Sequence, residues 1–278
     1  MVTNLKFMMI TASPEIALFV EQHGVNRIFI DQEVLGKADR QGHLNTHKAA
    51  HSLHDISSVA KVLKFAELMV RLNPINPLTL TEINSAIDAG AQRLMLPMFN
   101  HTSEVEFFLD KVAGRVPVTF LAETPASLVR IADWHPLLKP GFDEVHFGLN
   151  DLTIGMELTF LFEPLAGRLL EPAISLLRDA SISWGVGGVA RMNHGELSAE
   201  RVIGEHVRLG SSWVILSRAF HNSAENIEEL SKHLDFQHEV ALLRQSEQKW
   251  INSSFTELGS NHKALASDVF KIVNKMMH

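Results

Sequence analysis

The sequence predicts an α/β protein of the (β/α)8 (TIM) barrel class, with extra C-terminal helices. Short apolar runs typical of β-strands recur along the chain, and helix-like segments separate them. Most of these runs are continuously apolar rather than alternating, as expected for strands that are covered on both faces. Eight such strands alternate with helices over about 220 residues, which favours a barrel over a doubly wound open sheet.

The eight predicted strands come in chain order and are similar in length. They span 7–12, 27–33, 68–73, 93–99, 116–123, 144–150, 183–188 and 213–220.

Capping signals mark several of the helices between these strands. Ser13, Pro14 and Glu15 supply an N-cap, a proline at the first helical position and an acid in the first turn, and Gly24 can end that helix. The same arrangement of signals predicts further helices over 81–90, 103–114 and 198–210.

The pattern is helical from Phe220 to the end of the chain. We therefore expect a barrel core over residues 1–222 and a C-terminal helical extension over 223–278. This helical segment is longer than the single helix that would complete the barrel. The extension either packs on the barrel's own flank or bottom, or exchanges with a partner subunit in a homo-oligomer.

Composition narrows the functional classes. The net charge of −7 makes binding to nucleic acid unlikely as a main role, and the absence of cysteine excludes disulfides and thiolate chemistry. No N-terminal signal peptide and no run of about 18 apolar residues is evident, so we expect no membrane association and a cytoplasmic location.

Two acids stand at the carboxyl ends of neighbouring predicted strands. Glu123 ends one strand, and Asp151 follows the next. Active sites of (β/α)8 barrels lie at this end of the strands. Two hard oxygen ligands suit a divalent cation, and Mg²⁺ is expected in preference to Mn²⁺ or Co²⁺. The pair predicts a metal site for a small, oxygen-rich anion.

Three further charged residues end the second and third strands. Arg71 is predicted to bind a substrate carboxylate or carbonyl oxygen and to stabilise an enolate, or else to form an ion pair with the acids. Asp31 and Glu33 lie on the same side of their strand, because side chains alternate. They either hold a water or act in proton transfer, or they form a salt bridge in the barrel mouth.

The loop after the second strand is long and contains four histidines. It carries His43, His47, His51 and His54, and long loops of this kind often bind substrate or act as lids. His43 and His47 are the candidate catalytic bases. The helical spacing of His47, His51 and His54 also fits a solvated helix face.

The ends of the last two strands predict an anion site. Gly187 and Gly188 would allow backbone N–H groups to approach a phosphate or carboxylate, and Ser217 or Arg218 could assist. The same glycines could simply relieve crowding between neighbouring segments.

Several motifs, taken together, resemble the HpcH/HpaI aldolase/citrate lyase family. They are VRLNP, IDAGAQRLMLPMFN, FLAETPAS and GFDEVHFGLNDLT, and the resemblance extends over roughly residues 20–220. It implies a (β/α)8 barrel of the phosphoenolpyruvate/pyruvate type that usually binds a divalent metal and makes or breaks carbon–carbon bonds through an enolate.

The resemblance also implies roles for individual residues. Glu123 and Asp151 match the family's metal-binding carboxylates, and Arg71 matches its arginine at the reacting carbonyl. The segment from Gly148 through Asn150 to Asp151 matches the part that receives the pyruvate carboxylate.

Two positions depart from the family pattern. Val34 stands where the hydroxy-acid aldolases usually have the histidine that acts as a base, so His43 or His47 would have to replace it. Leu121 stands where several of these aldolases have glutamine. With the long loop after the second strand and the segments GVGGVARMN and LSRAF, these departures predict a divergent subgroup with a different substrate.

The resulting expectation is a metal-dependent aldolase or carbon–carbon lyase that acts on a pyruvate-type 2-oxo acid through a metal-stabilised enolate. The alternatives are lysis of a malyl- or citramalyl-type CoA thioester, phosphoenolpyruvate-type chemistry on a phosphorylated substrate, and a catalytically silent barrel that binds a small acid.

Overall fold

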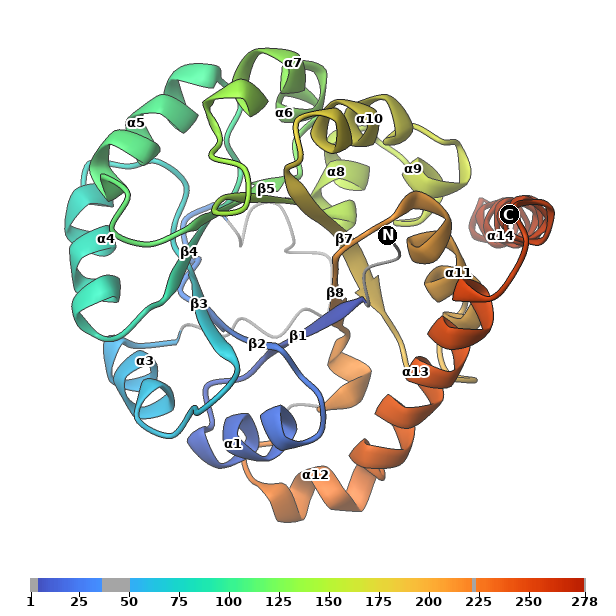
Figure 1. Ribbon diagram of the computed structural model, residues 1–278, viewed down its shortest axis with the longest axis horizontal. Coiled ribbons are helices and arrows are strands. Elements are labelled where there is room, and N and C mark those ends of the chain that lie inside the picture. The colour runs from blue at the N-terminus through green and yellow to red at the C-terminus, as the bar shows by residue number, and fades with distance from the viewer. Residues whose placement is uncertain (1–4, 37–50, 222–223, 278) are drawn as a thin grey trace.

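Eight parallel strands form a closed barrel in chain order, and helices surround it (Figure 1). The structure is a computed structural model that describes residues 5–36, 51–221 and 224–277. The predicted (β/α)8 barrel with additional C-terminal helices is confirmed. Pairing of Lys6 with Trp213 joins the first and last strands and closes the sheet.

All eight strands overlap the predicted segments. They are β1 Lys6–Ile10, β2 Arg27–Asp31, β3 Glu67–Arg71, β4 Arg93–Leu96, β5 Val118–Ala122, β6 Glu144–Phe147, β7 Ser183–Val189 and β8 Trp213–Leu216.

The helices of the barrel follow the strands in turn. They are α1 Pro14–Gln22, α3 Leu53–Ala60, α4 Thr79–Asp88, α5 Thr102–Val112, α6 Pro125–Val129, α7 Ile131–Trp134, α8 Leu149–Gly155, α9 Glu163–Ala166, α10 Glu171–Asp179 and α11 Ala199–Leu209, with 3-10 turns η1 His135–Leu137 and η2 Arg218–Phe220.

The hydrophobic core has two parts, because successive strand residues point to opposite faces. The larger part lies between the strands and the helices. The smaller part fills the barrel interior with large side chains, so the barrel is packed and not a pore. The interior residues are Met8, Phe29, Met69, Met95, Leu121 and Trp213.

An ion-pair network closes the amino-terminal end of the barrel. Arg27 is almost fully buried and stacks on the Trp213 ring, with its guanidinium carbon 3.6 Å from the ring centroid. It pairs with Glu67 at 2.5 Å and with Glu144 at 2.9 Å. Arg93 adds a contact to Glu67 at 3.1 Å. Two guanidinium groups therefore face two carboxylates.

The pKa of Glu144 reflects this balance of charge. Burial would raise it, but Arg27 and Arg93 outweigh burial and lower the pKa below its ordinary value. The Trp213 indole N–H also donates to Glu144, at 3.0 Å. This network has the character of a structural site.

Three helices follow the barrel: α12 Ile227–His233, α13 Phe236–Ile251 and α14 Phe255–Met276. Figure 1 shows α14 lying outside the ring of helices, next to α11. The predicted division into residues 1–222 and 223–278, and exchange of the extension between subunits, stay predictions.

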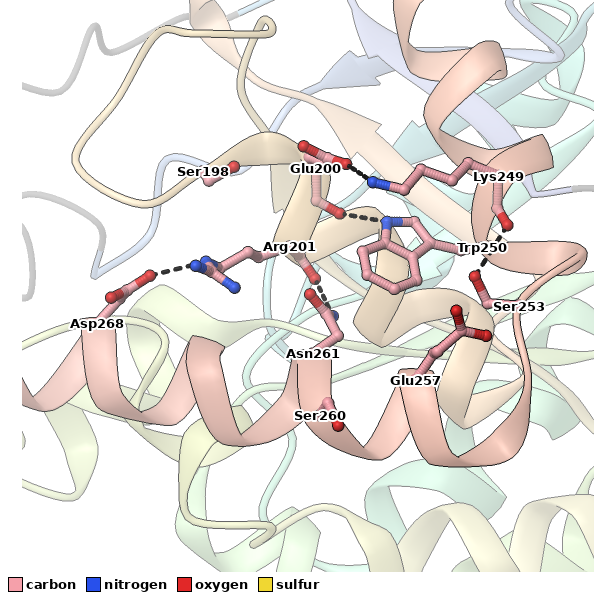
Figure 2. A pocket seen from close by; sticks show the side chains of 10 residues that line it. All are labelled: Ser198, Glu200, Arg201, Lys249, Trp250, Ser253, Glu257, Ser260, Asn261 and Asp268. Atoms are coloured by element: carbon pink, nitrogen blue, oxygen red, sulfur yellow. Dashed lines mark hydrogen bonds and ion pairs between the residues drawn. The ribbon is translucent and has the colours of Figure 1, made fainter.

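Side chains from α13 and α14 fix these helices on α11 (Figure 2). The Trp250 indole donates to the Glu200 carbonyl at 2.9 Å, and the Asn261 amide donates to the Arg201 carbonyl at 3.0 Å. Gly204 permits this approach, since a Cβ there would lie 2.5 Å from Asn261 Nδ2. In this structure α13 and α14 thus pack against the barrel helix α11.

Within the described part of the chain, no helix combines the length and the apolar character needed to cross a bilayer.

Candidate active site

Glu123 is held rigidly at the carboxyl end of β5. The next residue, Thr124, caps α6: its hydroxyl accepts from the Ser127 N–H at 3.0 Å and donates to the Phe99 carbonyl at 2.9 Å. The Glu123 side chain is only 3% exposed. The Met98 N–H donates to its Oε1 at 3.2 Å, and Met98 has a left-handed φ of 55°. Such backbone strain is often found at functional sites.

Gly148 lets β6 approach Glu123 closely. A Cβ at this position would lie 2.7 Å from both Cβ and Oε2 of Glu123, so only glycine fits. The Gly148 N–H also donates to the Ala122 carbonyl at 3.2 Å, which continues the pairing of the two strands. This close contact accounts for the glycine in the motif GLNDL.

Asp151 lies in the first turn of α8 and is buried. The predicted strand over 144–150 was too long: β6 ends at Phe147, and Gly148 begins the helix as its N-cap. Asn150 therefore lies on the helix, where it is exposed. An acid in the first turn interacts favourably with the helix dipole.

The pKa of Glu123 is raised well above its ordinary value. Burial is the largest cause, and the negative charges of Asp151 and Glu33 add to it. Arg71 and the Met98 N–H act in the opposite direction but do not cancel the effect. Glu123 and Asp151 are therefore close enough for their charges to interact strongly.

Arg71 forms a bidentate ion pair at the ends of β2 and β3. Its Nε and Nη2 donate to the two carboxylate oxygens of Asp31 at 2.9 and 2.7 Å, and Nη2 lies 3.4 Å from Glu33 Oε2. Burial alone would lower the pKa of Arg71, but Asp31, Glu33 and Glu123 raise it, so Arg71 is a permanent cation. Arg71 therefore forms the ion pair that was predicted as one alternative. Its Nη1 does not take part in the bond to Asp31.

The donor set fits a divalent cation. Three buried carboxylates, Asp31, Glu33 and Glu123, interact with the Arg71 guanidinium, and a fourth, Asp151, interacts with Glu123. Among the residues that the structure describes, no group of three or more His, Asp or Glu side chains could hold a metal. Mg²⁺ needs no such group, because it is commonly bound by one or two carboxylates together with waters and substrate. Glu123 and Asp151 match that requirement.

The two candidate bases, His43 and His47, lie outside the described residues. Val34 is 51% exposed, and its N–H donates to Asn73 Oδ1 at 2.9 Å.

The structure instead places His51 against the end of β2. The ring Nδ1 of His51 accepts from the backbone N–H of Asp31 at 3.0 Å, and the backbone N–H of His51 donates to the Asp31 carbonyl at 3.2 Å. Sequence reasoning named His51 but gave it no role. Twenty residues separate the two partners, and local spacing carries no signal of such a contact.

Close packing accounts for Gly187 and Gly188 in β7. A Cβ on Gly187 would lie 2.7 Å from the Leu149 side chain, and one on Gly188 would lie 3.1 Å from the Ile215 carbonyl. Gly187 also has a left-handed φ of 48°. Ser217 caps η2, where its hydroxyl accepts from the Ala219 N–H at 3.4 Å. An anion site at these residues stays a prediction.

His146 is a buried residue that sequence reasoning did not single out. Its Nε2 donates to the Gly187 carbonyl at 3.1 Å, and burial lowers its pKa to about 4. The imidazole is therefore neutral near pH 7 and holds the end of β7 in place.

Comparisons with known proteins agree with this architecture. No model of a protein family and no curated protein matches the sequence. Among solved structures, a protein of the HpcH/HpaI aldolase/citrate lyase family from Burkholderia cenocepacia J2315 superposes with a TM-score of 0.58 at 15% identity. The match covers 88% of this chain and 94% of that protein. The two share a fold.

The tryptophan synthase α subunit from Legionella pneumophila str. Paris is similar to nearly the same degree. Its TM-score is 0.55 at 15% identity, and the match covers 89% of this chain and 92% of that subunit. The structural resemblance therefore establishes the barrel fold, and the chemistry has to be argued from the site.

Proposed function

We propose that this protein is a divalent-metal-dependent carbon–carbon lyase or aldolase that acts on a pyruvate-type 2-oxo acid through an enolate. The observation that carries the proposal is the pairing of Glu123 with Asp151 at the carboxyl ends of β5 and β6. Burial and the neighbouring acids raise the pKa of Glu123, as expected of a ligand pair that awaits a cation. The motifs FLAETPAS and GFDEVHFGLNDLT, which resemble the HpcH/HpaI family, support the same reaction class.

Glu123 and Asp151 would hold Mg²⁺, Mn²⁺ or Co²⁺. Bound there, the cation would supply Lewis-acid stabilisation of the negative charge that develops when the 2-oxo acid loses a proton or a carbon–carbon bond breaks.

Arg71 supplies a second positive charge at the same site. Asp31 engages its Nε and Nη2 and so fixes the plane of the guanidinium. The remaining Nη1 edge can donate to one substrate oxygen as charge develops on it, without any rearrangement of the arginine. Glu33, which lies against Nη2, would hold a water for proton transfer.

Solvent-deuterium exchange into the methyl group of pyruvate tests the proposal. With added Mg²⁺ or Mn²⁺ we expect exchange, detected as loss of the methyl proton signal by NMR. Glu123→Gln and Asp151→Asn should lower the exchange rate by roughly 100-fold or more, because each removes a carboxylate that would hold the cation.

Exposed residues supply matched controls. Glu228→Gln and Asp179→Asn make the same chemical changes at side chains that are 81% and 75% exposed and should leave the rate unchanged. Metal-dependent exchange at the wild-type rate in both Glu123→Gln and Asp151→Asn would contradict the assignment of these residues as the metal ligands.

A further inference from the structure

The segment that follows β2 is held through its backbone at the barrel mouth. The Gln32 N–H donates to the Arg71 carbonyl at 2.9 Å, which continues the pairing of β2 with β3. The Glu33 N–H donates to Asp31 Oδ1 at 3.1 Å. Asn73, two residues beyond the end of β3, holds the residues that come next. The chain is therefore supported on both sides of the Glu33 side chain.

Asn73 holds two residues of this segment with one side chain. Its Oδ1 accepts from the Val34 N–H at 2.9 Å and from the Leu35 N–H at 3.0 Å. Its Nδ2 donates to Glu82 Oε1 at 2.9 Å, in the first turn of α4. Backbone N–H groups only donate and an ionised carboxylate only accepts, so these partners fix which way the amide faces. Asn73 is buried, and it links the start of the loop to α4.

The Glu33 carboxylate benefits from this support. Glu33 is buried, and its Oε2 lies 3.4 Å from Arg71 Nη2. The bidentate bond from Arg71 to Asp31 is shorter, at 2.9 and 2.7 Å. A single contact of 3.4 Å constrains a carboxylate less than a bidentate bond does. The backbone on either side of Glu33 therefore contributes to keeping its carboxylate against Arg71.

We propose that Asn73 is a positioning residue for the reaction at this mouth: it holds the Val34 and Leu35 amides and so keeps the Glu33 carboxylate where it would receive a proton. In that step a methyl C–H bond of pyruvate breaks, the proton passes through a water to Glu33, and the electron pair stays on the substrate as the enolate. The inference rests on the proposed enolate chemistry and deepens it. Asn73 acts through Glu33 and not on the substrate.

Two variants test whether the bonds of Asn73 matter. Asn73→Leu has a similar size and removes both the acceptor for Val34 and Leu35 and the donor to Glu82. The double variant Asn73→Asp with Glu82→Gln reverses the bond between the two side chains. The new amide at position 82 then donates to the new carboxylate at position 73, which still accepts from the two backbone N–H groups.

Asn84→Leu is the control. It makes the same chemical change on α4, where Asn84 Oδ1 accepts from Arg115 Nη1 at 2.8 Å. Deuterium exchange is measured against pyruvate concentration with saturating Mg²⁺, at a temperature where every variant is folded.

A split between kcat and KM is the expected signature of a positioning role. Asn73→Leu should lower kcat by roughly 10- to 100-fold, because a small displacement of a reacting group is costly, and should leave KM for pyruvate and the affinity for Mn²⁺ within about twofold. The double variant should recover kcat to within about threefold of the wild type, since it restores the support of the segment. The control should match the wild type.

Three results would overturn the positioning role while leaving the proposed function in place. One is wild-type kcat in Asn73→Leu. Another is a higher KM with unchanged kcat, which would indicate that Asn73 binds the substrate directly. The third is a folded double variant that is as slow as Asn73→Leu. If the wild type itself shows no metal-dependent exchange, the proposed function fails first, and the inference fails with it.

Discussion

The two ends of this barrel contain the same kinds of buried side chains and balance them differently. At the amino-terminal end, Arg27 and Arg93 face Glu67 and Glu144, and the pKa of Glu144 is lowered. At the carboxyl end, Arg71 interacts with three carboxylates, Asp31, Glu33 and Glu123, and the pKa of Glu123 is raised.

This difference separates a structural site from a functional one. A carboxylate that the fold has already matched with cations needs no further ligand. A buried acid whose ionised form is disfavoured by its surroundings can be satisfied by a bound cation instead, and such perturbed groups cluster at active sites. Both ends of the barrel contain buried ion pairs. They differ in the direction of the pKa shift, which is upward for Glu123 at the mouth and downward for Glu144 at the amino-terminal end.

The largest expected effect is at the amino-terminal end. Arg27→Met should lower the free energy of unfolding by roughly 3 kcal/mol, because it removes the buried cation that pairs with both Glu67 and Glu144 and leaves Arg93 to balance the two carboxylates. Denaturant unfolding measures this change. Arg178→Met, at a side chain that is 67% exposed, is the control and should change stability by less than about 0.5 kcal/mol.

Metal binding by the Arg27→Met protein sharpens the comparison. At a temperature where the variant is folded, its affinity for Mn²⁺ should equal that of the wild type. A large loss of affinity would show that the two ends are not independent.

A smaller effect of opposite sign is expected at the mouth. Because the pKa of Glu123 is higher in the folded state than in the unfolded state, its contribution to stability is greatest at low pH and declines as pH rises through the folded pKa. Glu123→Gln should therefore stabilise the metal-free protein by about 1 kcal/mol at neutral pH, as changes that relieve strained functional sites often do.

Glu144 should behave in the opposite way. Its pKa is lowered on folding, so its contribution is present above the unfolded pKa and is lost as pH falls through the folded pKa. Unfolding curves recorded across pH for Glu123→Gln and Glu144→Gln measure both. If Glu123→Gln destabilised the metal-free protein at neutral pH, the charge imbalance assigned to the mouth would be wrong.

Sequence patterns predicted the barrel well and the site only in part. Continuous apolar runs identified all eight strands, because strands buried on both faces need such runs. Seven of the eight strand ends were placed too late, since backbone pairing stops before apolar character does. At 144–150 the predicted strand included Asn150, which lies on a helix because Gly148 turns the chain beside Glu123.

Contacts between distant residues were beyond the reach of sequence reasoning. Side-chain type and strand position were enough to predict Glu123, Asp151 and Arg71 at the mouth. The bond from Asp31 to His51 depends on how the chain returns to the barrel after the long loop. The hydrophobic periodicity of the sequence does not predict how the chain returns to the barrel.

Calorimetric titration with Mn²⁺ tests the central claim most directly, in two buffers that differ in ionisation enthalpy. We predict one site, with release of protons on binding at pH values below the raised pKa of Glu123, and with affinity that increases as pH rises. Glu123→Gln and Asp151→Asn should each abolish or greatly weaken this binding. Wild-type affinity in both variants would contradict the account.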